Sequence, residues 1–96
     1  MVVSLAHSIY LKDCSMLSLR GNGIQHVPLE VWELQSLTHL DLSNNQLSDL
    51  PDELGNLKEL EELYLNNNQL TTLPLAVLDL PRLKLLNVTG NQLPEV

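Results

Sequence analysis

Four side chains that could take part in chemistry stand in two pairs, each separated by 23 residues: His39 with Glu62, and Asp41 with Tyr64. A histidine beside a carboxylate could exchange a proton or hold a metal ion. One histidine and two carboxylates, without a second histidine or a cysteine nearby, nevertheless make a poor zinc site. We therefore interpret His39 and Glu62 as a solvated contact, and the sequence predicts no metal site.

Catalysis would need more than these groups. A nucleophile, a base and an orienting group must be held together in a pocket that excludes water. The sequence contains no GxGxxG or phosphate-loop pattern, and Gly21-Asn22-Gly23 fits a single turn after a strand. We expect no catalytic residue, no cofactor and no enzymatic activity.

The spacing of 23 residues extends through most of the chain and defines an internal repeat. Leucine and other apolar residues recur at this interval, and so do an asparagine and a proline. A period of this length, with an apolar-x-apolar stretch followed by Asn, is a repeat signature. The main columns are Leu17, Leu40, Leu63 and Leu86; Leu19, Leu42, Leu65 and Val88; Asn22, Asn45, Asn68 and Asn91; and Pro28, Pro51 and Pro74.

Each unit contains two patterns of apolar residues. Leu40-Asp41-Leu42 alternates as a half-buried strand does, whereas leucines from Pro51 to Leu57 are three apart, as in a short helical turn. Strands that alternate with such turns must be parallel. Stacking the units then builds the core from columns of leucine.

These units read LxxLxLxxNxLxxLPxxLxxLxx from Cys14 to Val96. In this the sequence resembles the intracellular leucine-rich repeat proteins of the type found in Ras-associated and cell-polarity scaffolds. The resemblance implies an α/β solenoid of about four repeats, with a parallel sheet on its concave face and short helical or irregular convex segments. It also implies a role in binding other proteins.

The repeat register divides the chain. Residues 1–13 fit a degenerate N-terminal cap or half repeat, and the units are 14–36, 37–59, 60–82 and an incomplete 83–96. Because the last unit stops before its helical half, we expect its apolar side chains to lack a cover. The chain is then a fragment, a short gene product, or a protomer that self-associates through this end.

The asparagine column has a structural and a functional interpretation. A buried amide without partners would cost roughly 1–3 kcal/mol, so we expect these side chains to bond to backbone groups of their own and the adjacent turn. The alternative is a row of ligand-binding amides. The proline column should fix φ at the entry to the convex segment.

Side chains between the core leucines should point out of the concave face. Tyr64 is the leading candidate for an interface anchor, because tyrosine is enriched among residues that dominate binding energy. The alternative is that Tyr64 only covers neighbouring strands. The predicted partner-binding residues are Arg20, His39, Asp41, Ser43, Glu62, Tyr64, Asn66 and Asn87.

Charge limits the choice of partner. The formal net charge is −7 with only five Lys and Arg, which argues against nucleic acid and favours a protein that is basic or neutral at the contact. The acidic run Glu59, Glu61 and Glu62 is either a solvated face or a region that steers such a partner. No stretch is long enough to span a membrane. The single Cys14 excludes an internal disulfide and favours the cytoplasm.

Two classes of function remain open. The favoured one is a protein-binding module or scaffold in signalling that does no chemistry. The alternative is a recognition segment of a larger regulatory protein, such as a kinase, ubiquitin ligase or small-GTPase regulator, or a truncated repeat fragment. A further repeat encoded after Val96 would identify a fragment.

Overall fold

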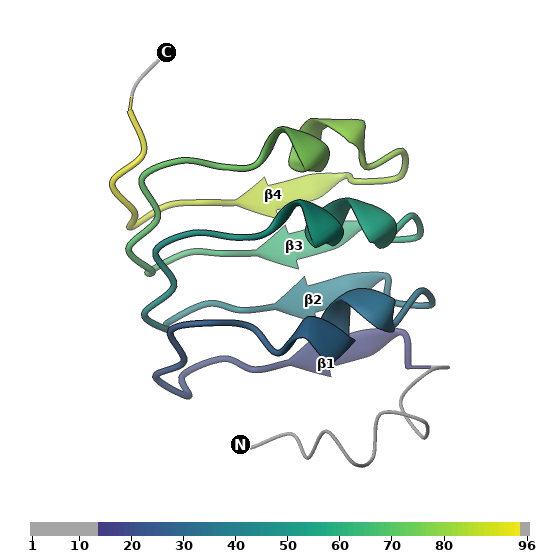
Figure 1. The fold of residues 1–96 in the computed structure, drawn as a ribbon, viewed down its shortest axis with the longest axis horizontal. Coiled ribbons are helices and arrows are strands. Elements are labelled where there is room, and N and C mark those ends of the chain that lie inside the picture. Colours follow the sequence, from purple (N-terminus) through teal and green to yellow (C-terminus); the bar gives the residue numbers. More distant parts are fainter. Residues whose placement is uncertain (1–13, 95–96) are drawn as a thin grey trace.

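A computed structural model describes residues 14–94 of the chain as one parallel sheet with short helices along one side (Figure 1). The strands β1 (Met16–Ser18), β2 (His39–Asp41), β3 (Glu62–Tyr64) and β4 (Leu85–Asn87) are hydrogen-bonded in chain order. The α/β repeat solenoid is therefore confirmed. The N-terminal segment predicted as a cap lies outside the described residues, as do residues 95–96.

The strands pair in the register that the sequence predicts. Leu17 lies opposite Leu40, Leu40 opposite Leu63, and Leu63 opposite Leu86. In each strand the central leucine points toward the core and its two neighbours point to the other side, because side chains alternate along a strand. The outward side chains of β1–β4 form what we call the open sheet face.

Within residues 14–94, the opposite side carries three 3₁₀ helices, η2 (Leu29–Glu33), η3 (Asp52–Asn56) and η4 (Leu75–Asp79). A proline precedes each one, with φ of −55° at Pro28, −79° at Pro51 and −65° at Pro74. Proline suits this position because its missing N–H would have no partner in the first turn. The helical turn expected within Pro51–Leu57 is η3.

The core lies between the sheet and the helices. Leu40 and Leu63 are completely buried, as are the leucines that pack on them from the helical side, such as Leu54. The corresponding residues of the last unit are only partly buried: Leu83, Leu86, Val88 and Leu93. Self-association through this end stays a prediction. Residues 14–94 contain no helix that is long and apolar enough to cross a membrane.

The asparagine column forms a hydrogen-bonded ladder, as predicted. The Asn45 amide donates to the backbone oxygens of Leu19, in the preceding unit, and Leu42, both at 3.0 Å. Its side-chain oxygen accepts from the backbone N–H groups of Asn22 at 2.9 Å and Ile24 at 3.2 Å. Each amide thus joins two successive units.

Asn68 repeats this arrangement one unit further on. Its amide donates to Leu42 and Leu65, both at 3.0 Å, and its oxygen accepts from the Leu47 N–H at 3.1 Å. The residue just before each ladder asparagine has a left-handed backbone, with φ between 56° and 71°. Glycine and asparagine adopt this conformation most readily. The four residues are Gly21, Asn44, Asn67 and Gly90.

Candidate functional site

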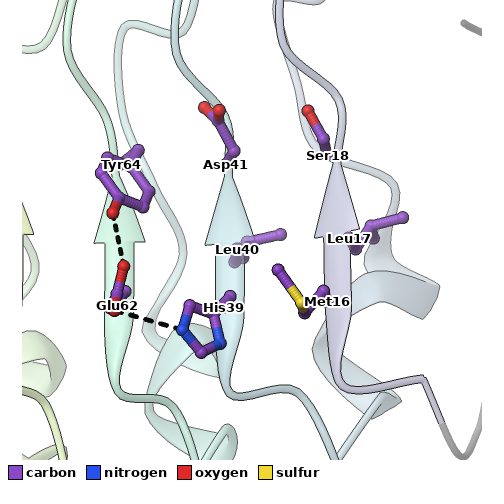
Figure 2. A pocket seen from close by; sticks show the side chains of 8 residues that line it. All are labelled: Met16, Leu17, Ser18, His39, Leu40, Asp41, Glu62 and Tyr64. Atoms are coloured by element: carbon purple, nitrogen blue, oxygen red, sulfur yellow. Dashed lines mark hydrogen bonds and ion pairs between the residues drawn. The ribbon is translucent and has the colours of Figure 1, made fainter.

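A hollow of about 370 Å³ lies on the open sheet face across β1, β2 and β3 (Figure 2). Its exposed lining is more apolar than polar. Met16 stands out because 66% of its surface is exposed, an unusual position for a large apolar side chain. The lining residues are Met16, Leu17, Ser18, His39, Leu40, Asp41, Glu62 and Tyr64.

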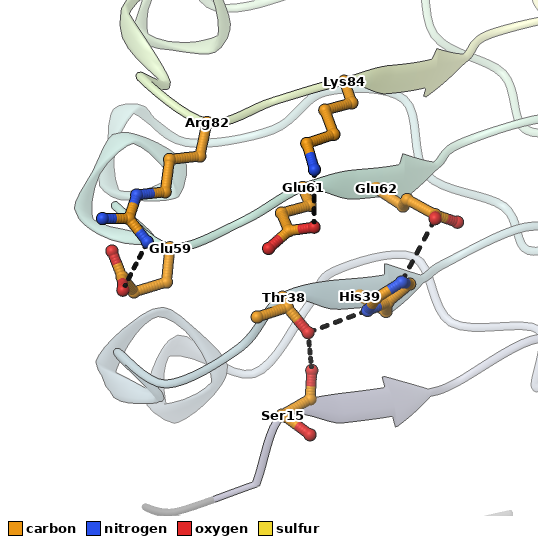
Figure 3. Close-up of polar contacts among 8 residues, drawn as sticks. All are labelled: Ser15, Thr38, His39, Glu59, Glu61, Glu62, Arg82 and Lys84. Atoms are coloured by element: carbon orange, nitrogen blue, oxygen red, sulfur yellow. Dashed lines mark hydrogen bonds and ion pairs between the residues drawn. The ribbon is translucent and has the colours of Figure 1, made fainter.

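The imidazole of His39 is held at both ring nitrogens. Its Nε2 lies 3.2 Å from a carboxylate oxygen of Glu62 on the neighbouring strand, and its Nδ1 lies 2.8 Å from the Thr38 hydroxyl. The Thr38 hydroxyl in turn donates to the backbone oxygen of Ser15 at 3.0 Å (Figure 3). Both nitrogens are therefore engaged by groups of this chain, and the predicted His39–Glu62 contact is present.

Glu62 also accepts a short hydrogen bond from the hydroxyl of Tyr64 (Figure 2). This bond is the main reason that the pKa of Glu62 lies below its ordinary value; partial desolvation opposes it, and His39 supports it. The same bond raises the pKa of Tyr64, followed by desolvation and by the charges of Glu62 and Asp41. The Tyr64 hydroxyl is thus committed to Glu62, while its ring faces the hollow.

Asp41 lies in the next row of the open sheet face and has a different environment. Its Oδ1 accepts from the backbone N–H of Ser43 at 2.9 Å and from the Ser43 hydroxyl at 2.6 Å. Ser43 is only 1% exposed, so it does not lie on the open surface as the sequence analysis expected. Its hydroxyl turns back to Asp41, and Ser43 therefore holds the Asp41 carboxylate in place.

The remaining predicted residues lie outside the hollow. Arg20 is exposed just after β1 in the first unit, beside Asn44. The Asn44 side-chain oxygen accepts from the Arg20 guanidinium at 3.1 Å when the amide is turned toward it. Asn66 and Asn87 are half-buried. The structure thus brings together His39, Asp41, Glu62 and Tyr64, with Ser43 bonded to Asp41, but not Arg20, Asn66 or Asn87. Tyr64 as a binding anchor stays a prediction.

Sequence reasoning gave no binding role to Met16 or Ser18, although both line the hollow. A signal was present: Met16 is in the column of His39 and Glu62, and Ser18 is in that of Asp41 and Tyr64. An apolar side chain that occupies an outward column is a candidate contact residue.

The other two glutamates of the acidic run form ion pairs with the next unit (Figure 3). Glu59 lies 3.2 Å from Arg82, and Glu61 lies 3.4 Å from Lys84. Exposed pairs of this kind contribute little to stability, about 0–1 kcal/mol. Their effect here is that part of the negative charge of the run is compensated within the chain, which favours the solvated face over a steering role.

The described part of the chain holds no group of three His, Cys, Asp or Glu side chains suited to a metal ion. The polar groups of the hollow instead form hydrogen bonds with one another, beside apolar side chains. Such a surface can hold side chains of another molecule by shape, hydrogen bonding and charge.

Comparison with known families agrees with the repeat fold. A family model described as leucine rich repeat matches residues 14–70, more than half of the chain, and one described as two copies of the repeat matches residues 58–96. The chain belongs to the leucine-rich repeat family. Leucine-rich repeat domains are generally protein-interaction modules rather than enzymes. No curated protein matches the sequence significantly.

Three solved structures show the same repeat architecture. A leucine-rich repeat protein of Leptospira interrogans is 30% identical with a TM-score of 0.80, over 96% of this chain and 29% of that one. The ectodomain of BIR2 from Arabidopsis thaliana is 30% identical with a TM-score of 0.66, over 88% and 48%. The plant peptide hormone receptor RGFR1, solved in complex with RGF2, is 27% identical with a TM-score of 0.50, over 83% and 16%. This leucine-rich repeat chain therefore spans less than half of each.

Proposed function

We propose that this leucine-rich repeat chain binds another protein through the open sheet face and does no chemistry of its own. The observation that carries the proposal is the hollow over β1–β3, in which an aromatic ring and an exposed methionine stand beside hydrogen-bonded polar groups. Aromatic residues and methionine are enriched at protein interfaces. Membership of a family of interaction modules supports the same conclusion.

Tyr64 is the proposed anchor of the interface. Its hydroxyl is fixed by Glu62, so the ring is presented in one orientation at small entropic cost. The partner is basic or neutral where it meets this face, because the chain has a net charge of −7. The receptor RGFR1, solved with RGF2 bound, is a related structure that holds another molecule.

A second proposal is that the chain serves as the recognition segment of a larger regulatory protein. It is supported by the small share of each related structure that the chain covers, 29% for the Leptospira interrogans protein. The four short strands also present fewer contacts than the 20–30 residues of a stable interface. A Ras-associated or polarity-scaffold role in the cytoplasm fits this proposal and remains to be tested.

The direct test compares the capture of partners by two variants of the whole chain. Tyr64→Ala removes the proposed anchor, and Glu53→Ala changes an exposed residue of η3 on the opposite side. We expect Tyr64→Ala to lose at least about tenfold of the captured partner, since anchors contribute about 2 kcal/mol or more. We expect Glu53→Ala to retain it. Quantitative mass spectrometry after affinity capture from cell extract measures both.

Circular dichroism of the two variants confirms that each remains folded before capture is compared. The opposite pattern, with binding retained by Tyr64→Ala and lost by Glu53→Ala, would place the interface on the helical side and reject the open sheet face.

A further inference from the structure

The carboxylates on and beside the open sheet face differ in whether a basic side chain of the protein contacts them. Glu62 faces His39 and accepts from Tyr64, and the exposed glutamates beside it pair with Arg82 and Lys84. Asp41 differs: between residues 14 and 94 no Lys, Arg or His forms an ion pair with it. Among the described residues, Asp41 is therefore the carboxylate of the hollow that no basic side chain contacts.

The turn after β2 does not need this charge. Asn87 occupies the same column as Asp41 two units later, and its side-chain oxygen accepts from the Thr89 N–H at 3.1 Å and the Thr89 hydroxyl at 2.9 Å. Asp41 makes the same two bonds with Ser43. A neutral amide thus performs the structural role at this position, so the charge of Asp41 is available for another purpose.

The surroundings of Asp41 suit a cation with an aliphatic stem. Tyr64 is its direct partner across the β2–β3 register, and Ser18 is its partner on β1 (Figure 2). The carboxylate is close enough for its charge to help raise the pKa of the Tyr64 hydroxyl. A lysine or arginine beside a carboxylate and an aromatic face gains from both charge pairing and cation–π attraction.

We propose that Asp41 and the ring of Tyr64 bind one basic side chain of an extended segment of the partner protein, while an apolar side chain of that segment covers Met16. The proposal rests on the proposed function, because it assigns a partner chemistry to the same face. Charge complementarity selects this occupant. The aliphatic stem of the basic side chain lies along the Tyr64 ring and over strands β1 and β2, between Met16 and Asp41.

The arrangement also fixes the spacing within the partner. Met16 and Asp41 are one strand apart and two residues apart along the strand direction, a diagonal of about 8 Å. In an extended chain, residues i and i+2 point to the same side and are about 6.8 Å apart. The partner segment should therefore carry its apolar and its basic residue two positions apart.

Two peptides test the basic side chain directly. Each is a short capped threonine peptide with one leucine and, two positions later, either arginine or its neutral analogue citrulline. Amide chemical shifts of the full chain, followed during titration, give the two dissociation constants. We expect the arginine peptide to bind about fivefold more tightly at low salt, with the largest shifts in β1–β3.

Three variants of the protein locate the charge that causes this preference. Asp41→Asn keeps a side-chain oxygen that accepts from Ser43, as the Asn87 oxygen accepts from Thr89. This variant should bring the ratio of the two dissociation constants close to one. Glu62→Gln should reduce the preference less than Asp41→Asn does, because the Glu62 carboxylate already bonds to Tyr64 and His39. Asp52→Asn, on η3, is the control for net charge and should leave it unchanged.

Either of two results would overturn the site: no preference for arginine up to a few millimolar peptide, or the same preference in Asp41→Asn as in the wild type. Both results are distinguishable from failure of the proposed function. If Tyr64→Ala still loses the captured partner while the peptides show no preference, the open sheet face binds protein but not through a basic side chain at Asp41.

Discussion

Two sets of polar side chains, both spaced by 23 residues, have opposite surroundings. The asparagine ladder places the same amide at every unit, and Asn45 and Asn68 are buried with backbone partners on both sides. The open sheet face places a different residue at each unit: Asp41 accepts from Ser43, whereas Tyr64, at the same position one unit later, donates to Glu62. Within one fold, uniform columns support the stack and varied columns are available for recognition.

The largest expected effect tests the ladder. Asn68→Ala leaves two carbonyl oxygens and a backbone N–H without their partner, so we expect it to destabilise the chain by roughly 2–4 kcal/mol. Asn66 is half-buried in the same turn, and Asn66→Ala should lower the free energy of unfolding by less than about 1 kcal/mol. Urea unfolding followed by the fluorescence of the single tryptophan, Trp32, measures both.

Trp32 is buried, so its emission reports unfolding of the core. Equal midpoints for Asn66→Ala and Asn68→Ala would mean that the ladder does not stabilise the stack more than the outward residues do.

A smaller effect separates two glycines in the left-handed column before the ladder. Both have φ near 70°, so alanine at either position should cost about 1 kcal/mol. A methyl group at Gly21 meets nothing within 4 Å, whereas one at Gly90 collides with the side-chain oxygen of Asn67. We therefore expect Gly90→Ala to lower the urea midpoint more than Gly21→Ala does. The reverse order would contradict the close approach of Asn67 to Gly90 in the structure.

The smallest effect concerns the open sheet face and its pH dependence. Because Glu62 has a lowered pKa in the folded chain, its bond with Tyr64 supports folding above the pKa of an unfolded glutamate and is lost as pH falls through the lowered value. Because Tyr64 has a raised pKa, the contribution is also lost as pH rises through that value. Both groups are only half-buried and stay in contact with solvent, so the change in stability should be small.

The raised pKa of Tyr64 can be observed without unfolding. In a Tyr10→Phe background, Tyr64 is the remaining tyrosine, and its ionisation is followed by the ultraviolet absorbance of tyrosinate. Glu62→Gln should lower the midpoint toward the ordinary value of about 10, because the charged acceptor is gone. A midpoint that is unchanged by Glu62→Gln would show that the hydrogen bond is not the cause.

Uniform columns were predictable from the sequence because their spacing alone implies stacking. The register of Leu17, Leu40 and Leu63 and the bonding of Asn45 follow from one repeated environment. The site was predictable only in part. Its four central residues lie together, as their columns indicate, but the turning of the Ser43 side chain toward Asp41 depends on a rotamer that no spacing records.

The sequence also did not reveal which acidic side chains form ion pairs within the chain. Whether Glu59 and Glu61 stay available to a partner depends on where Arg82 and Lys84 direct their long side chains in the next unit. Such choices are made among several rotamers of similar energy. Sequence alone therefore indicated which positions face outward, but not which of their charged side chains stay available to a partner protein.

The asparagine ladder also determines how the stack would respond to tension. Because the Asn45 and Asn68 amides each bond to the preceding unit, every boundary between units is crossed by the same kind of bonds, in addition to those of the sheet. Pulling on the two ends of the stack loads these boundaries in series, and an outer unit, which has one neighbour, detaches before an inner one. Each detached unit of 23 residues would release about 80 Å of extended chain. Under such a load we expect the stack to lengthen in discrete steps, one unit at a time.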